Sequence, residues 1–320
     1  MGRYIIRRLL YLFLVIIIIT VLMFAIFFLM PPTDPALAFA GKQPTPEILA
    51  EVRRSLGLDK PVHVQYLLFV KRLFLGDEFG WPGLGRSYVY RESVRDLLIE
   101  RFPASFQLAV GGAIIWLSLG IPIGILSALK RRSFADRAAM VFALIGVSAP
   151  IFWLGQIALF VFWQKLGISP GTGYEPLSNF GEWLSHMWLP WIILAINFAA
   201  FYARMVRGNL LETMGEDYIR TARAKGLTER RVIGKHGLRS SLTPIATMFG
   251  MDFAILVGQA VITESVFNIQ GVGVLTVEAA NRGDLPVLLG LTVLIALVVS
   301  FMSLIVDVLY AYLDPRVRYS

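Results

Sequence analysis

Residues 9–30 read LLYLFLVIIIITVLMFAIFFLM, which is 22 consecutive residues without a charged side chain. About 20 apolar residues suffice for a helix to cross the hydrocarbon core of a bilayer. Residues 285–306, LPVLLGLTVLIALVVSFMSLIV, form a second uncharged run of the same length. These two runs, near opposite ends of the chain, predict an all-α integral membrane protein.

The composition of the whole chain supports this prediction and excludes several other classes. Of the 320 residues, 56% are hydrophobic and only 16% are charged, whereas soluble domains average about 45–50% and about 25%. The absence of cysteine excludes disulfides and thiolate metal sites, and the three histidines, His63, His186 and His236, are widely spaced. No phosphate-binding G-x-x-x-x-G-K-[ST] sequence occurs. We therefore expect neither a catalytic centre nor a cofactor bound by this chain.

Six membrane spans are predicted, at residues 9–30, 104–128, 139–163, 187–203, 244–267 and 285–306. Pro122 and Pro150 fall in the second and third spans, where proline is tolerated if neighbouring groups satisfy the freed backbone. A cleavable signal peptide is the alternative for the N-terminus, because arginines precede the first run and residues 38–40 have a small-x-small pattern. A signal peptide's apolar region is only about 7–15 residues long, which favours a membrane helix.

The distribution of lysine and arginine predicts the orientation of the spans. Residues 1–8, 129–138, 204–243 and 307–320 hold 18 of the 30 basic residues, whereas the short segments 164–186 and 268–284 hold only Lys165 and Arg282. Short basic loops stay on the cytoplasmic side, so both termini are predicted to be cytoplasmic. The predicted domains are then residues 1–30 (N-terminus and first span), 31–103 (a small extracytoplasmic domain), 104–313 (the membrane-spanning core) and 314–320 (a cytoplasmic tail).

The predicted extracytoplasmic domain, residues 31–103, has its own helix signals. Thr45 is placed to cap a helix that has Pro46 at its first position, and Gly57 is placed to end it. An amphipathic stretch follows at residues 62–75, and residues 92–101 form a helix that leads into the second span. The segment is therefore predicted to be mainly helical.

The cytoplasmic loop 204–243 carries most of the net charge. It holds nine basic and four acidic residues, a net charge of +5 out of +8 for the whole chain. Its pattern predicts a helix over 210–224, a break at Gly226 and a second helix over 228–239 with Thr228 as N-cap. A solvated connection is the simpler interpretation, but a helix–glycine–helix between two spans favours a docking element for a cytoplasmic partner.

Within this loop, residues 220–227, RTARAKGL, resemble the Glu-Ala-Ala-x-x-x-Gly coupling loop of ABC importer permeases. The Arg-Thr-Ala-Arg-Ala-Lys-Gly form is typical of the dipeptide/oligopeptide branch. The resemblance covers essentially the whole chain, since four further segments are similar to that branch in the same order: residues 45–61, 101–105, 264–273 and 307–318. Arg220, Thr221, His236 and Arg239 depart from the general motif. The match favours the permease with the large outer domain.

The resemblance implies a type-1 ABC importer permease fold that imports dipeptides or oligopeptides across a bacterial or archaeal inner membrane. It implies a heterodimer with a second permease, one or two nucleotide-binding subunits that hold ATP and Mg, an extracytoplasmic solute-binding protein, and no nucleic acid. The implied ATPase-coupling residues are Asp217, Arg220, Thr221, Ala222, Ala224, Lys225, Gly226 and Leu227. The implied residues for the outer gate or the binding-protein contact are Glu264, Phe267, Gly271 and Gly273.

Asp252 is predicted to lie within the membrane, because it follows Pro244 by eight residues, about 12 Å along a helix. An intramembrane charge faces a bundle interior or a water-filled cavity. Asp252 with Leu256 and Gln259 on one helix face predicts a stripe that lines the translocation pathway. The alternative is a structural partner on another span, such as Asn197 or Gln156. Asp307 is expected to pair with an arginine of the coupling loop.

Two alternatives to a peptide importer stay open at this point. The same machinery could import nickel, glutathione or haem, because the branch serves several solutes. A secondary transporter would need inverted repeats with broken helices in matching positions, and the sequence shows no internal symmetry. A membrane enzyme would need several ionisable groups at one depth, where Asp252 stands almost alone.

Overall fold

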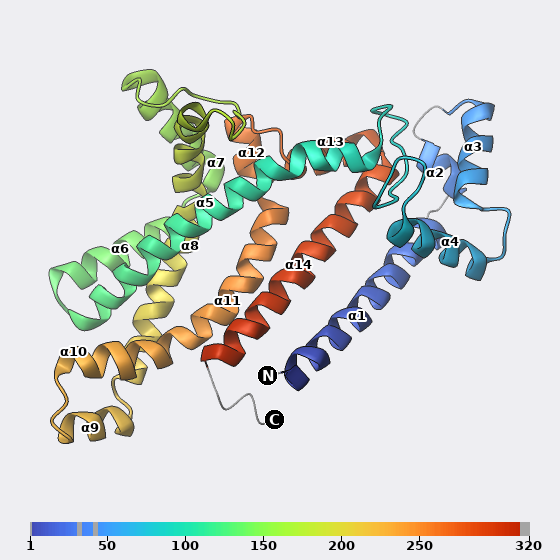
Figure 1. Cartoon of the computed structure of the whole chain (residues 1–320). Coiled ribbons are helices and arrows are strands. Elements are labelled where there is room, and N and C mark those ends of the chain that lie inside the picture. Colours follow the sequence, from blue (N-terminus) through green and yellow to red (C-terminus); the bar gives the residue numbers. More distant parts are fainter. Residues whose placement is uncertain (1, 31–33, 41–43, 314–320) are drawn as a thin grey trace. The chain divides into compact units, whose positions relative to one another are not determined.

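The computed structural model describes residues 2–30, 34–40 and 44–313 (Figure 1). In these residues the chain is helical, with two isolated β-bridges, Asp77–Gly80 and Arg86–Ser93, in the connecting loops. The contacts divide the chain into two compact units. Of the described residues, the terminal unit comprises those within 2–105 together with 270–301, and the loop-bearing unit comprises 106–269 and 302–313.

The terminal unit is built on the first helix and the segment that follows it. Its helices are α1 (Gly2–Phe24) with a π-helical end η1 (Ala25–Leu29), α2 (Pro35–Ala40), α3 (Pro46–Leu56), α4 (Val62–Leu75), α13 (Val272–Arg282), the first part of α5 (Val94–Leu129) and most of α14 (Leu285–Leu313). Phe28 lies at the centre of its core, with ring centroids 4.9 Å from Phe24, 5.0 Å from Phe39 and 5.6 Å from Phe69. Burial of aromatic side chains therefore fixes α2 and α4 against the end of the first helix.

The helix signals between residues 45 and 75 are confirmed. Thr45 Oγ1 accepts a hydrogen bond from the backbone N–H of Ile48 at 3.4 Å, and Pro46 occupies the first turn of α3. Gly57 ends the helix at φ +67°, a left-handed conformation that favours glycine. The helix predicted at residues 92–101 forms the start of α5, which begins at Val94 and runs unbroken for 36 residues.

The loop-bearing unit contains the rest of α5, the end of α14 and nine further elements. They are α6 (Phe134–Ser148), α7 (Ile151–Ala158), η2 (Leu159–Lys165), α8 (Phe180–Thr213), α9 (Asp217–Ala224), α10 (Glu229–Arg231), η3 (Val232–Gly237), α11 (Leu238–Gln259) and α12 (Val261–Phe267). Trp116 of α5 is fully buried and stacks on Phe198 of α8 at 4.7 Å. Its ring also lies 5.3 Å from that of Phe249 in α11, so one side chain joins three helices.

The α5–α8 contact depends on glycine. At Gly120 a Cβ atom would lie 2.9 Å from the carbonyl oxygen of Ala199, and at Gly124 it would lie 2.6 Å from that of Ala203. Small residues four apart let two helix backbones approach closely, and this is a common way for membrane helices to pack. The two glycines therefore set how closely α5 and α8 pack.

The predicted third span is wrong as a single helix. The chain bends by 104° between α6 and the α7–η2 helix, at Pro150. Ala149 before it is extended (φ −78°, ψ 126°), as expected for a residue that precedes proline. Proline also lacks the N–H that would continue the ladder, so residues 139–163 form two helix pieces.

The bounds of the fourth and fifth spans also differ from the prediction. Residues 187–203 lie inside α8, which has 34 residues because the polar segments on both sides continue the helix past the apolar stretch. Residues 244–267 are divided at Ala260 between α11 and α12. Among the described residues, three helices are long and apolar enough to span a membrane, or four if the bent α6–α7 pair counts as one. The apolar part of the first helix, Phe13–Leu29, is shorter.

Candidate functional site

The predicted coupling segment folds as a short separate helix beyond the end of α8 (Figure 1). The single helix predicted over residues 210–224 is wrong, because Glu216 is extended (φ −68°, ψ 150°) and α9 begins only at Asp217. The second predicted helix, over residues 228–239, starts at Glu229 but continues through η3 into α11 without a break. Thr228 stands at the N-cap position and makes no side-chain capping bond. Its backbone carbonyl instead accepts from the N–H of Arg231 at 2.8 Å.

A small apolar core holds α9 in place. Ile219, Ala222 and Val232 are buried together, and Met214 and Leu227 pack against them. Ala222 is 6% exposed, so its methyl group faces the segment's own core. A larger side chain at Ala222 would push α9 away from η3, so the fold itself requires a small residue there. The coupling role implied for Ala222 stays a prediction.

The remaining predicted coupling residues form the outer surface of the segment. Leu227 is partly buried, and the exposed ones are Asp217, Arg220, Thr221, Ala224, Lys225 and Gly226. Gly226 has a left-handed φ of +75°, and the predicted break in the helix at this residue is confirmed. Nothing lies within 4 Å of the position that a Cβ atom would take there. The segment therefore presents a mixed polar helix face and an unobstructed glycine turn.

One ion pair crosses the Gly226 turn. Arg223 donates from Nε to Glu229 Oε2 at 3.1 Å and from Nη2 to Oε1 at 2.6 Å. These hydrogen bonds lower the pKa of the Glu229 carboxyl below its ordinary value of 4.5 and raise the pKa of the Arg223 guanidinium. This bidentate ion pair connects α9 to α10, although both side chains are about half exposed.

The pH dependence of this link is predictable. Because the pKa of Glu229 is lower in the folded segment, the stabilisation is present above the ordinary glutamate pKa and is lost as pH falls through the lowered value. We expect amide protection in α9 to decrease below about pH 4.5, and Arg223→Gln to remove that decrease. Hydrogen exchange across residues 217–232 checks this, with Arg230→Gln as the control. An unchanged profile in Arg223→Gln would show that the pair does not hold the turn.

Asp252 has a partner that sequence reasoning did not identify. The hydroxyl of Tyr202 in α8 donates to Asp252 Oδ2 at 2.7 Å. Asn197, one of the two expected partners, donates instead to the backbone carbonyl of Gly146 at 3.1 Å. Asp252 is partly exposed, while Leu256 is buried at 3% and the side chain of Gln259 lies outside the described residues. One carboxylate oxygen of Asp252 therefore accepts a hydrogen bond from Tyr202, and the residue remains partly accessible. Leu256 packs inside the unit.

The four residues predicted at the outer gate are all buried. Glu264 is 0% and Phe267 1% exposed, and Gly271 and Gly273 are also buried. The side chains of Glu264 and Phe267 and the backbone at Gly271 and Gly273 are therefore covered by the chain itself and are not available for direct contact with another protein in this conformation. Their gating role stays a prediction. The side chain of Asp307, predicted to pair with the coupling loop, lies outside the described residues.

Two side-chain hydrogen bonds between distant segments tie the terminal unit together. Ser87 donates to Asp284, both residues being fully buried, and Tyr90 donates to Glu278 Oε2 at 2.9 Å. Burial raises the pKa of the Asp284 carboxyl, and burial together with the Glu278 bond raises the pKa of Tyr90 to about 12. These bonds join residues 87–90 to α13 and to the start of α14. A cavity of about 390 Å³ in the same unit is lined by apolar and charged residues, none of them a predicted site residue.

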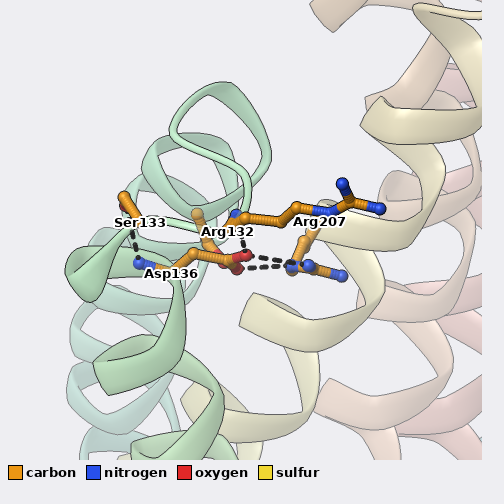
Figure 2. Close-up of polar contacts among 5 residues, drawn as sticks. Arg132, Ser133, Asp136 and Arg207 are labelled. Atoms are coloured by element: carbon orange, nitrogen blue, oxygen red, sulfur yellow. Dashed lines mark hydrogen bonds and ion pairs between the residues drawn. The ribbon is translucent and has the colours of Figure 1, made fainter.

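A buried ion pair in the loop-bearing unit was not predicted (Figure 2). Asp136, in the first turn of α6, accepts two hydrogen bonds from Arg207 of α8, from Nε at 2.7 Å and from Nη2 at 3.0 Å. The backbone N–H of Asp136 in turn donates to Ser133 Oγ at 3.2 Å. The Ser-x-x-Asp spacing of 133–136 resembles a helix-capping signature and could have located the carboxylate. Its partner, 71 positions away, has no such signal.

Comparison with known proteins gives consistent results along the chain. A family model described as the binding-protein-dependent transport system inner membrane component matches residues 120–319, and the corresponding N-terminal model matches residues 1–109. The chain is 38% identical to the dipeptide transport system permease protein of Escherichia coli (strain K12), covering 100% of this chain and 99% of that protein.

Two further comparisons agree with these matches, one by sequence and one by fold alone. A putative peptide transport system permease protein of Brucella abortus (strain 2308) is 39% identical over 90% of each chain. The MetNI methionine ABC transporter in an inward-facing conformation has a TM-score of 0.53 at 20% identity, covering 69% of this chain and 97% of that one, which shows a shared fold. The chain therefore belongs to the family of binding-protein-dependent transport system inner membrane components.

Proposed function

We propose that this chain is a permease subunit of an ATP-driven importer of dipeptides or oligopeptides. The observation that carries the proposal is the similarity to the Escherichia coli dipeptide permease, which extends over the full length of both chains. The fold shared with a methionine ABC transporter agrees with this class of machine. Transport by such a subunit needs no catalytic residue of its own, because the energy comes from ATP hydrolysis in separate subunits.

The coupling contact is the exposed face of α9. Asp217, Arg220, Thr221, Ala224 and Lys225 present side chains outward, while Ile219 and Ala222 hold the helix to η3. A nucleotide-binding subunit that seats on this face would move α9 and, with it, the ends of α8 and α11. ATP and Mg would be held by one or two such subunits.

The remaining assembly follows from the same proposal. A second permease would complete a central pathway, and an extracytoplasmic solute-binding protein would deliver peptide to the side that carries residues 31–103 and 268–284. We propose six spans in an inner membrane with both termini in the cytoplasm. The support is the placement of lysine and arginine, together with a family description that names an inner membrane component.

Asp252 is proposed to face the pathway and to contact a polar group of the peptide, such as its terminal amine. Replacement by asparagine keeps an oxygen that accepts from Tyr202 but removes the charge. If the charge acts on substrate, Asp252→Asn lowers peptide uptake about tenfold, since a hydrogen bond to a charged group contributes about 1.5–3 kcal/mol. Uptake of labelled dipeptide checks this, and Tyr202→Phe is the control for the structural bond. Unchanged uptake in Asp252→Asn would assign the residue a packing role.

Reconstitution tests the proposed function directly. The chain is co-expressed with its partner permease, ATPase subunits and binding protein, purified through a tag on this chain, and placed in proteoliposomes. We expect the ATPase subunits to co-purify and labelled dipeptide to enter only when ATP is supplied. Competition by nickel, glutathione or haem in place of peptides would reassign the cargo. Uptake that continues without ATP would reject the ABC mechanism.

A further inference from the structure

The carboxylate of Asp136 has every acceptor position occupied. Oδ1 accepts from Arg207 Nε at 2.7 Å and from Ser127 Oγ at 2.5 Å. Oδ2 accepts from Arg207 Nη2 at 3.0 Å and from the backbone N–H of Arg132 at 2.8 Å. A carboxylate offers about four acceptor positions, so this group is saturated, and its side chain is only 6% exposed.

These four bonds join three helices at one point. Ser127 lies near the end of α5, Arg132 lies in the turn that follows, and Arg207 lies in α8. The turn is tight, since Arg132 itself has φ +66°, and its own N–H is one of the donors to Asp136. Because the Arg207 fork is planar and makes two parallel bonds, α8 cannot rotate or slide at this point without breaking at least one of them.

The same stretch of α8 is in continuous contact with the coupling segment. Arg207 precedes the end of α8 at Thr213 by six residues, and Leu210 lies one turn beyond it, fully buried. Gly237 of η3 packs against this end: a Cβ atom there would lie 3.1 Å from Met214 Sδ and 3.5 Å from Leu210 Cδ1. Met214 also packs on the core of α9. An unbroken series of contacts therefore runs from α9 to Arg207.

We propose that Asp136 and Arg207 are positioning residues for transport: their ion pair passes the displacement of α9 to α5 and α6, so that ATP-driven movement opens or closes the pathway. This rests on the proposed function, in which ATPase subunits act on α9. Apolar contacts at the end of α8 resist compression but are non-directional. The bidentate ion pair also resists separation of α8 from α6 and rotation of one helix against the other. Without it, α9 and α8 would move while the α5–α6 turn stays behind.

The test compares transport with ATP hydrolysis in the complete transporter reconstituted in proteoliposomes. The variants are Asp136→Asn, Arg207→Gln and the double variant Asp136→Asn/Arg207→Gln. Arg204→Gln is the matched control, because this exposed arginine lies one turn earlier on α8, and Arg131→Gln removes a charge from the same α5–α6 turn. Arg207→Lys keeps the charge without the fork. Three quantities are measured: co-purified ATPase subunits, ATP hydrolysed and labelled dipeptide taken up.

The expected result is uncoupling. Each single variant retains its ATPase subunits and hydrolyses ATP within about twofold of wild type, while dipeptide taken up per ATP falls at least about tenfold. The double variant is no worse than either single one, as expected for two residues that act through one bond. Arg207→Lys is intermediate, and both controls match wild type.

Two outcomes would overturn the inference. Wild-type uptake per ATP in the single variants would show that the pair transmits nothing. A parallel loss of uptake, ATP hydrolysis and assembled complex would show that it serves only to stabilise the fold. Failure of the proposed function is distinguishable, because then the wild-type transporter itself would show no ATP-dependent dipeptide uptake.

Discussion

Gly226→Trp should abolish the attachment of the ATPase subunits while leaving the permease folded. No atom lies within 4 Å of the Cβ position of Gly226, so within this chain the indole projects into open space. The backbone strain of a side chain at φ +75° costs about 1–2 kcal/mol and is nearly the same for alanine as for tryptophan. The two variants therefore differ mainly in what they present to a partner.

Tryptophan at the centre of a docking surface removes contacts worth about 3 kcal/mol or more, a factor of about 100 or more in affinity. We expect Gly226→Trp to purify without ATPase subunits and to support no dipeptide uptake, whereas Gly226→Ala retains most of both. Co-purification through a tag on this chain, with a thermal unfolding curve for each variant, checks this. If Gly226→Trp binds the ATPase subunits as well as Gly226→Ala does, the docking surface lies elsewhere.

Gly124→Val should prevent folded permease from accumulating in the membrane. The new Cβ atom would lie 2.6 Å from the carbonyl oxygen of Ala203 and 2.7 Å from the Cβ of Val206. No rotamer change relieves a contact with a backbone oxygen, so α5 and α8 must separate along a buried surface. Overpacking of this kind costs about 3 kcal/mol, a large part of the stability of a typical fold.

The matched control is Gly208→Ala, at an exposed glycine of α8 with nothing within 4 Å of its Cβ position. Because alanine is the better helix former by about 1 kcal/mol, we expect Gly208→Ala to be as stable as wild type or more so. For both variants, quantitative immunoblotting measures the amount of permease in the membrane. Size-exclusion chromatography of the detergent extract measures the monodisperse fraction. Normal accumulation of Gly124→Val would mean that the α5–α8 packing described above does not limit stability.

The features that sequence predicted correctly are those whose signals are adjacent in the chain. Thr45, Pro46 and Gly57 define the two ends of α3 through local hydrogen bonding and backbone conformation, and Gly226 defines the coupling turn by the same logic. Long apolar runs likewise identify α5 and α14, because one helix must satisfy its own backbone in a membrane.

The features that sequence did not predict depend on contacts between distant segments. Tyr202 and Asp252 are 50 positions apart, and Asp136 and Arg207 are 71 apart, so no spacing rule relates them. The break before α9 is different. The predicted helix over 210–224 contains Gly215, a residue that by itself does not show where a helix ends, and the chain turns where Ile219 packs on the distant Val232. Pro150 was recognised, but whether a proline kinks a helix or divides it depends on its neighbours.

The small core beneath α9 divides the residues of the predicted coupling segment into those that the fold requires and those that it leaves free to vary. The positions that agree with the general importer motif, Ala222 and Gly226, are those that the fold requires, one buried and one in a left-handed turn. The positions that depart from it, Arg220 and Thr221, are exposed and can be exchanged at little cost to the segment's stability. Under the proposed docking of an ATPase subunit on α9, substitution of the exposed face alone should change which ATPase subunit binds and leave the segment folded. The buried core and the glycine turn preserve the segment's structure, while its exposed side chains can vary.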